Sequence, residues 1–296
     1  MVNEVVLRRK AINDFSVSTP PTSTDCKLCI LLSVCSPCKL LCIKLNMSPL
    51  KVKKYSQNLA RWVVCDCILL MELTGKDEDY FSVFDDSIQN LDDIQSEVPL
   101  LSYRIQFCKM MCSFWKGDYV SAEEQAHTSL GTYFKLDPKT YIYHTFFSGL
   151  ISFQLYRTLG GDERLKNGKE MLDQMKAWAY AVPLENKRLL LEAEYVALTN
   201  EESNDAEQLY KSSIKAARDH LNIHELALAY ELLGSYHAKK SQEDSNCCFE
   251  KAFVYYTQWG AIKVAQRVSE QHDLNTAFVD DYLLQVQDAK HARQEH

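Results

Sequence analysis

The chain has 296 residues, 46% of them hydrophobic, which is enough to bury a substantial core in one large domain or two ordinary ones. Only 9 Gly and 7 Pro are present, too few turn formers for a many-stranded β-sandwich or barrel, which needs a break about every 8–12 residues. The net charge is −7, and because residues 1–54 carry +6, the rest of the chain carries −13. An acidic body argues against nucleic-acid binding, whose affinity comes mainly from cations on phosphates.

Residues 1–49 differ from the rest of the chain. A Ser/Thr/Pro-rich stretch and a cysteine-rich run succeed one another without a helical period, which predicts an irregular or disordered leader. Cys26, Cys29, Cys35 and Cys38 have the spacing Cys-x2-Cys-x5-Cys-x2-Cys, and four thiolates bind Zn²⁺ tetrahedrally. The loop between the pairs is shorter than the roughly 12–20 residues of common zinc ribbons and fingers. A zinc site and incidental apolar cysteines are the two alternatives; otherwise the sequence predicts no cofactor.

The cysteines also bear on the compartment. Their number, 11, is odd and includes adjacent pairs such as Cys247 and Cys248, which favours reduced, buried thiols and a cytoplasmic location over a disulfide framework. The apolar stretch from residue 28 begins too late for an ordinary signal peptide. Lys39 and Lys44 interrupt it, whereas a membrane span needs about 20 uninterrupted apolar residues, so we predict none.

From residue 50 onward, apolar side chains recur every three or four residues, the period of amphipathic helices. Residues 77–97 contain eight acids and no base, which a solvated helix face explains, with a metal cluster as the alternative. Turn residues divide the chain beyond residue 99 into separate helices. The expected helices are 100–115 and 119–135 as a hairpin around Lys116-Gly117-Asp118, one from Pro138 to the break at Gly160-Gly161-Asp162, 163–181, one opened by Pro183, one started by Asn204-Asp205, and two more marked by Tyr230 and Phe253.

These helices are related by a nearly constant offset. Leu209, Tyr210, Ile214 and Ala217 each lie 39 residues before Cys248, Phe249, Phe253 and Tyr256, and the same offset leads back to Met171, Met175 and Trp178. A period of this length with two helices per unit is typical of an α-solenoid, in which stacked pairs share a continuous core. The sequence therefore predicts an all-α, tetratricopeptide-like solenoid of antiparallel helix pairs over 50–272, preceded by the leader 1–49 and followed by a helical or disordered tail, 273–296.

A series of motifs from Tyr141 onward also points to a known family. In order they are Phe147-Ser148-Gly149-Leu150, Glu185 to Glu194, Ala206-x-x-Leu209-Tyr210, His224-Glu225-Leu226 up to Gly234, and Tyr255-x-x-x-Trp259-Gly260-Ala261-x-Lys263. Together they resemble the helical-repeat region of multidomain sensor kinases and related predicted ATPases. There the region follows an ATPase domain and precedes sensor and output modules such as kinases or cyclases. The turn near Lys239-Lys240-Ser241 departs from the pattern because it lacks the usual Gly.

The resemblance implies a non-catalytic interaction or regulatory scaffold of a signal-transduction protein. Its partners would be proteins or peptides, including neighbouring ATPase, kinase or cyclase domains. The alternative is a fragment of a larger ATPase-linked kinase or cyclase whose catalytic domains lie elsewhere. We find no nucleophile–base pair and no phosphate-binding loop, and therefore predict no enzymatic activity. The candidates for partner contact are Trp259, Lys263, His224, Glu225 and Tyr230, with Trp259 either packed in a helix corner or exposed as an aromatic anchor.

Overall fold

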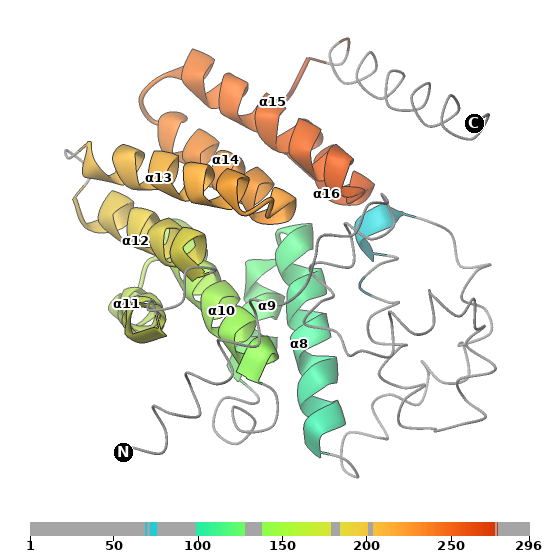
Figure 1. The fold of residues 1–296 in the computed structure, drawn as a ribbon, viewed down its shortest axis with the longest axis vertical. Helices are drawn as coiled ribbons and strands as arrows, with labels where there is room; N and C mark the ends of the chain where they lie inside the picture. Colours follow the sequence, from blue (N-terminus) through green and yellow to red (C-terminus); the bar gives the residue numbers. More distant parts are fainter. Residues whose placement is uncertain are drawn as a thin grey trace.

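A computed structural model of the chain describes residues 69, 72–75, 99–127, 138–178, 184–200, 204–275 and 277. All regular elements in these residues are helices, so the all-α class is confirmed for this part of the chain (Figure 1). The helices are α8 (Pro99–Lys116), α9 (Tyr119–His127), α10 (Pro138–Leu159), α11 (Asp162–Trp178), α12 (Glu185–Thr199), α13 (Asp205–Asp219), α14 (Ile223–His237), α15 (Gln242–Trp259) and α16 (Ile262–Gln271). None of the described helices is long and apolar enough to cross a membrane.

Short turns join consecutive helices into pairs, and the predicted turn residues make them. Gly117 has a φ of +80°, and the backbone N–H of Asp118 donates to the carbonyl of Ser113, which ends α8. The Asp118 carboxylate then accepts from the backbone N–H of Ser121 at 3.1 Å, which starts α9. Gly160 and Gly161, with φ of +71° and +98°, separate α10 from α11. These predicted breaks are confirmed.

The connection between α14 and α15 lacks a glycine, and a serine takes over part of its role. The Ser241 hydroxyl accepts from the backbone N–H of Asp244 at 3.3 Å and thereby caps the start of α15. At the other end of α15, Gly260 adopts a left-handed conformation, with a φ of +96°, and reverses the chain into α16. The glycine missing at the first turn therefore does not prevent the helix pair from forming.

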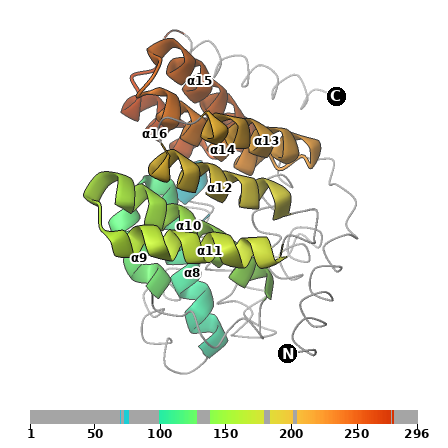
Figure 2. The ribbon, with the colours of Figure 1, turned by 90° about the vertical axis from the view of Figure 1, so that its left-hand side faces the viewer.

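The pairs α8–α9, α10–α11, α12–α13 and α14–α15 succeed one another along the molecule, and α10 also packs on α12 and α12 on α14 (Figure 2). The 39-residue offset relates the second helices of three pairs. Met175 of α11, Ile214 of α13 and Phe253 of α15, spaced by this offset, are all buried. The repeated apolar pattern therefore marks core positions, because each pair buries the same stripe against its first helix.

Two features shape the core of this stack. Helix α14 is central, since thirteen of its fifteen residues are buried. In addition, α8 contacts α16: the Arg267 Nε donates to the Trp115 carbonyl at 3.0 Å, and the Trp115 and Trp259 rings lie 5.5 Å apart. Repeats of an extended solenoid contact only their neighbours. Here the first and last of the helices α8 to α16 touch.

Several predicted features lie outside the described residues. These are the leader 1–49 with the four cysteines of the zinc hypothesis, the acidic run 77–97, the part of helix 119–135 after His127, and most of the tail 273–296. Within the described part, no group of three or more His, Cys, Asp or Glu side chains is arranged to hold a metal ion.

Candidate functional site

The five residues predicted to contact a partner lie in three different places. Trp259, His224 and Glu225 are buried, with exposed fractions of 2% or less. Their side chains pack inside the helix stack, where the His224 ring lies 5.4 Å from the Trp259 ring. Of the two alternatives for Trp259, a side chain packed in a helix corner and an exposed aromatic anchor, the structure therefore shows the first. A partner could not reach these three residues without opening the fold.

Tyr230 and Lys263 line two separate surface hollows. Lys263 is exposed in a hollow of about 300 Å³ between α8, α16 and residues 72–73, together with Glu72, Lys116 and Arg267. Tyr230 lines a larger groove between α13, α14 and α15. The predicted residues thus do not form one site.

The buried carboxylate Glu225 belongs to an ion pair inside the fold. Its Oε1 lies 2.6 Å from the Lys187 Nζ, and the Asn186 side-chain amide also donates to this carboxylate. The Lys187 ammonium lies over the Tyr143 ring, 4.8 Å from its centre. Burial opposes the charge on Glu225, but the ammonium and His224 outweigh it and lower the pKa of this carboxyl to about 2. The pair is therefore charged at neutral pH and joins α12 to α14.

Two further buried carboxylates are held in the same way, each by an arginine and a tyrosine. Glu194 of α12 accepts from Arg157 of α10 at 2.9 Å and also from the hydroxyl of Tyr210 of α13, so the two contacts together join three helices. Glu231 accepts from Tyr256 at 2.7 Å and from Arg267 at 2.8 Å. Burial, reinforced by the nearby carboxylates, raises the pKa of both tyrosines well above the usual value, so both hydroxyls keep their protons.

These three carboxylates are suited to holding helices together rather than to catalysis. A general acid or base needs a pKa near the working pH and a reachable reacting group. Glu225 has a pKa of about 2, and all three carboxylates are closed off by their partners. Neither surface hollow is lined by Glu194, Glu225 or Glu231.

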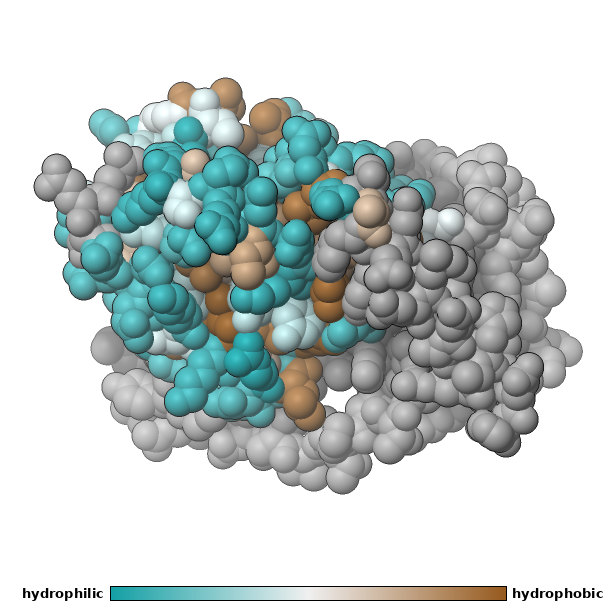
Figure 3. All heavy atoms as spheres, turned by 90° about the horizontal axis from the view of Figure 1, so that it is seen from above, coloured by the Kyte–Doolittle hydropathy of each residue, from teal (hydrophilic) through white to brown (hydrophobic). Residues whose placement is uncertain are grey.

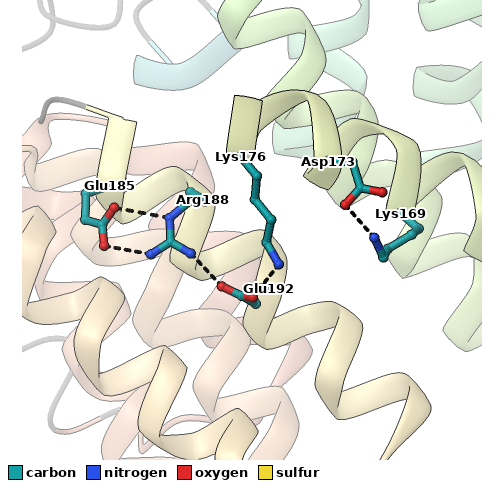
Figure 4. Close-up of polar contacts among 6 residues, drawn as sticks. All are labelled: Lys169, Asp173, Lys176, Glu185, Arg188 and Glu192. Atoms are coloured by element: carbon teal, nitrogen blue, oxygen red, sulfur yellow. Dashed lines mark hydrogen bonds and ion pairs between the residues drawn. The ribbon is translucent and has the colours of Figure 1, made fainter. Parts of the chain in front are cut away.

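A chain of surface ion pairs joins α11 to α12. Lys176 of α11 lies 2.5 Å from Glu192 of α12, which also accepts from Arg188 at 2.6 Å, and Arg188 in turn binds Glu185 (Figure 4). Lys176 is 40% and Glu185 41% exposed. Exposed pairs of this kind each contribute only about 0–1 kcal/mol. Every charge in the chain of pairs already has a partner, which leaves none for a ligand.

A groove with a volume of about 560 Å³ lies between α13, α14 and α15. We call it the basic groove. It contains Tyr230, Leu233 and Ile214 as its apolar part, Cys247 and Cys248 from α15, the two acids Glu207 and Asp244, and the five cations Lys211, Lys215, Arg218, Lys240 and Lys251. Seen from the end of the molecule where these helices lie, the described side chains are mostly hydrophilic with hydrophobic ones between them (Figure 3).

Most of the cations in the basic groove are not neutralised by an acid. Lys211 pairs with Glu207 at 2.6 Å. Arg218 donates to the Tyr230 hydroxyl at 2.8 Å, and Lys240 donates to the Tyr236 hydroxyl at 2.6 Å, so both have neutral partners. Lys251 lies over the Tyr230 ring at 5.6 Å, and a hydrogen bond with Cys247 raises its pKa. Among the described residues, Lys215, Arg218, Lys240 and Lys251 form no ion pair with a carboxylate.

The two cysteines of the groove differ in access. Cys247 is exposed, whereas Cys248 is buried, and burial raises the pKa of the Cys248 thiol to about 11. The Cys248 thiol is therefore uncharged at neutral pH and largely covered, whereas the Cys247 thiol is exposed at the surface of the groove.

The comparisons with known proteins returned nothing: no family model matches the sequence, and no curated protein and no solved structure does either. The resemblance to the helical-repeat region of sensor kinases therefore stays a prediction. The basic groove was missed from the sequence because Lys211, Lys215 and Arg218 read as an ordinary solvated helix face. Their spacing of four and three residues was a usable signal, but Lys240 and Lys251 join them only through the fold.

Proposed function

We propose that the chain is a non-catalytic protein-binding module that holds its partner in the basic groove. The observation that supports this is the groove itself, an open hollow whose cations Lys215, Arg218 and Lys251 lack carboxylate partners in the described chain. Charges left unpaired on a surface are available to a ligand, whereas the buried carboxylates Glu194, Glu225 and Glu231 are already occupied by the fold.

We also propose how the helix pairs are arranged as a whole. The successive helix pairs and the 39-residue spacing of Met175, Ile214 and Phe253 support a tetratricopeptide-like α-solenoid, although contact between α8 and α16 makes it more closed than an extended array. A place in a cytoplasmic signalling protein, next to ATPase, kinase or cyclase domains, rests on the sequence resemblance alone.

A steric block of the groove tests this function. Cys247 is exposed on the groove rim, so Cys247→Trp would fill part of the groove without changing charge, and Cys247→Ala is its matched control. The full chain and both variants would be immobilised and exposed to an extract of the source cells. We expect proteins that the wild type and Cys247→Ala retain to be missing from Cys247→Trp. If the three chains retain the same proteins, or none, the groove is not the binding site.

A further inference from the structure

We propose that the basic groove recognises an extended acidic peptide segment of another protein, with its carboxylates on Lys215, Arg218 and Lys251 and an apolar side chain between them. This deepens the proposed function and rests on it. The partner is defined by charge: five cations and two acids line the groove, an excess of three positive charges on a chain whose net charge is −7. The acidic remainder of the protein repels anionic ligands, whereas the positive groove attracts them, so such ligands are directed to the groove.

The cations are arranged as a row rather than a point. Lys211, Lys215 and Arg218 succeed one another at four and three residues along α13, so they lie on one face of the helix. At 1.5 Å per residue the row is about 10 Å long. In an extended peptide, side chains on one face recur about every 7 Å. Because Lys211 is already paired with Glu207, a peptide running along α13 would place one carboxylate at Lys215 and Arg218 and a second at Lys251 of α15, which a single small anion with one carboxylate could not do.

Lys251 faces this row from the other helix. It projects from α15 over the Tyr230 ring, whose hydroxyl accepts the hydrogen bond from Arg218. Tyr230 is also stacked on Tyr255, with 5.7 Å between ring centres and 12° between planes, so its ring is held in place. The cations of α13 and α15 thus converge on one tyrosine, which positions them before any ligand arrives.

The apolar part of the groove sets the second requirement. Ile214 and Leu233 line it and are 6% and 4% exposed, which leaves a small apolar surface between the cations. A ligand that carries an apolar residue between acids would cover this surface and gain from its burial.

The lining of the groove also favours a peptide over RNA. A single-stranded nucleic acid needs several stacking platforms and a longer basic track, whereas Glu207 and Asp244 interrupt this one.

The test uses the full chain and a short fluorescein-labelled peptide in which Asp and Glu alternate with Leu, with binding measured by fluorescence anisotropy. The groove variant is Lys215→Glu, and the matched control is Lys166→Glu on α11, an exposed lysine that is not part of the groove lining. We expect Lys215→Glu to raise the Kd about tenfold, because a reversed charge a few ångströms from a carboxylate turns attraction into repulsion. Lys166→Glu should leave the Kd unchanged within about twofold. Far-UV circular dichroism would show that both variants are folded.

Two further probes separate the ligand classes. A peptide with Lys in place of each acid should not bind, and replacing Leu by Ser in the acidic peptide should weaken binding. The inference is overturned if the acidic peptide does not bind, if the basic peptide binds equally well, or if both variants weaken binding equally. It is also overturned if a labelled oligouridine binds more tightly than the peptide and depends on Lys215. If the peptide fails while Cys247→Trp still removes proteins from the pull-down, the groove binds a protein of another chemistry and only this inference falls.

Discussion

Replacing Lys187 with Met would test the role of the buried ion pairs. The Lys187 ammonium and the Glu225 carboxylate are 2.6 Å apart, and the two side chains are only 3% and 1% exposed. Methionine keeps much of the apolar stem but removes the charge, so Glu225 would stay buried without its cation. Removing one partner of a buried pair typically costs about 3–5 kcal/mol, because the other charge is left uncompensated.

The depressed pKa of Glu225 leads to a similar value for how much its charged partners stabilise the fold. Its pKa is 4.5 in the absence of the fold and about 2 in the folded chain. A difference of about 2.5 units corresponds to about 3 kcal/mol. Since the pKa is depressed on folding, this stabilisation is complete above pH 4.5 and is lost as the pH falls toward 2. Lys187→Met should be less stable at neutral pH and should lose most of this pH dependence.

Urea denaturation followed by far-UV circular dichroism, at neutral pH and in steps down to about pH 3, would measure both effects. Lys169→Met is the matched control, because Lys169 pairs with Asp173 on the surface, where the two side chains are 36% and 55% exposed (Figure 4). Its loss should be at most about 1 kcal/mol. A loss under about 1 kcal/mol for Lys187→Met, or equal losses for the two variants, would refute the argument that burial makes this pair a structural tie.

Three other changes have definite expected outcomes. Gly234→Ala would place a Cβ 2.8 Å from a ring carbon of Phe249 and should cost about 1–3 kcal/mol in urea denaturation, with Phe249→Leu in the same chain recovering part of it. Tyr256→Phe removes the 2.7 Å hydrogen bond to buried Glu231 and should cost about 1–3 kcal/mol by the same assay. Burial lowers the pKa of His144 from 6.5 to about 4, so its neutral form is favoured by folding and stability should fall as the pH drops from 6.5 to 4. That part of the pH dependence should vanish in His144→Phe, as denaturation at several pH values would show.

Local signals in the sequence predicted much of the fold. The breaks at Gly117 and at Gly160-Gly161 were readable because only glycine adopts these left-handed conformations at low cost. The 39-residue offset was readable because the same helix of each pair buries the same stripe. Contact between α8 and α16 could not be foreseen, since it depends on how the small rotation of each pair accumulates over the whole stack.

The site was less accessible from the sequence, because residue type does not distinguish a buried charge from an exposed one. His224 and Glu225 look like surface residues and lie in the core, whereas Lys215 looks like an ordinary surface lysine and lines the groove. On other helices, the buried carboxylates find their partners at separations of 16 to 40 residues, as in Glu194 with Tyr210 and Gln154. Such distances in the sequence carry no pattern that would point to a pair.

The described helices therefore carry two contrasting kinds of charged side chain, buried carboxylates with a cation as partner and groove cations without a carboxylate as partner. Glu194, Glu225 and Glu231 are each tied to a cation on another helix, so moving one helix pair against the next would expose or unpair a buried charge. That cost opposes relative movement of α10, α12, α14 and α16 beneath the groove. The cations Lys215 and Lys251 stand on α13 and α15, which are tied to the same carboxylates by the hydrogen bonds from Tyr210 to Glu194 and from Tyr256 to Glu231. A ligand that bridges them would then lose little free energy to rearrangement of the protein, which is the condition under which a few exposed charges give useful affinity.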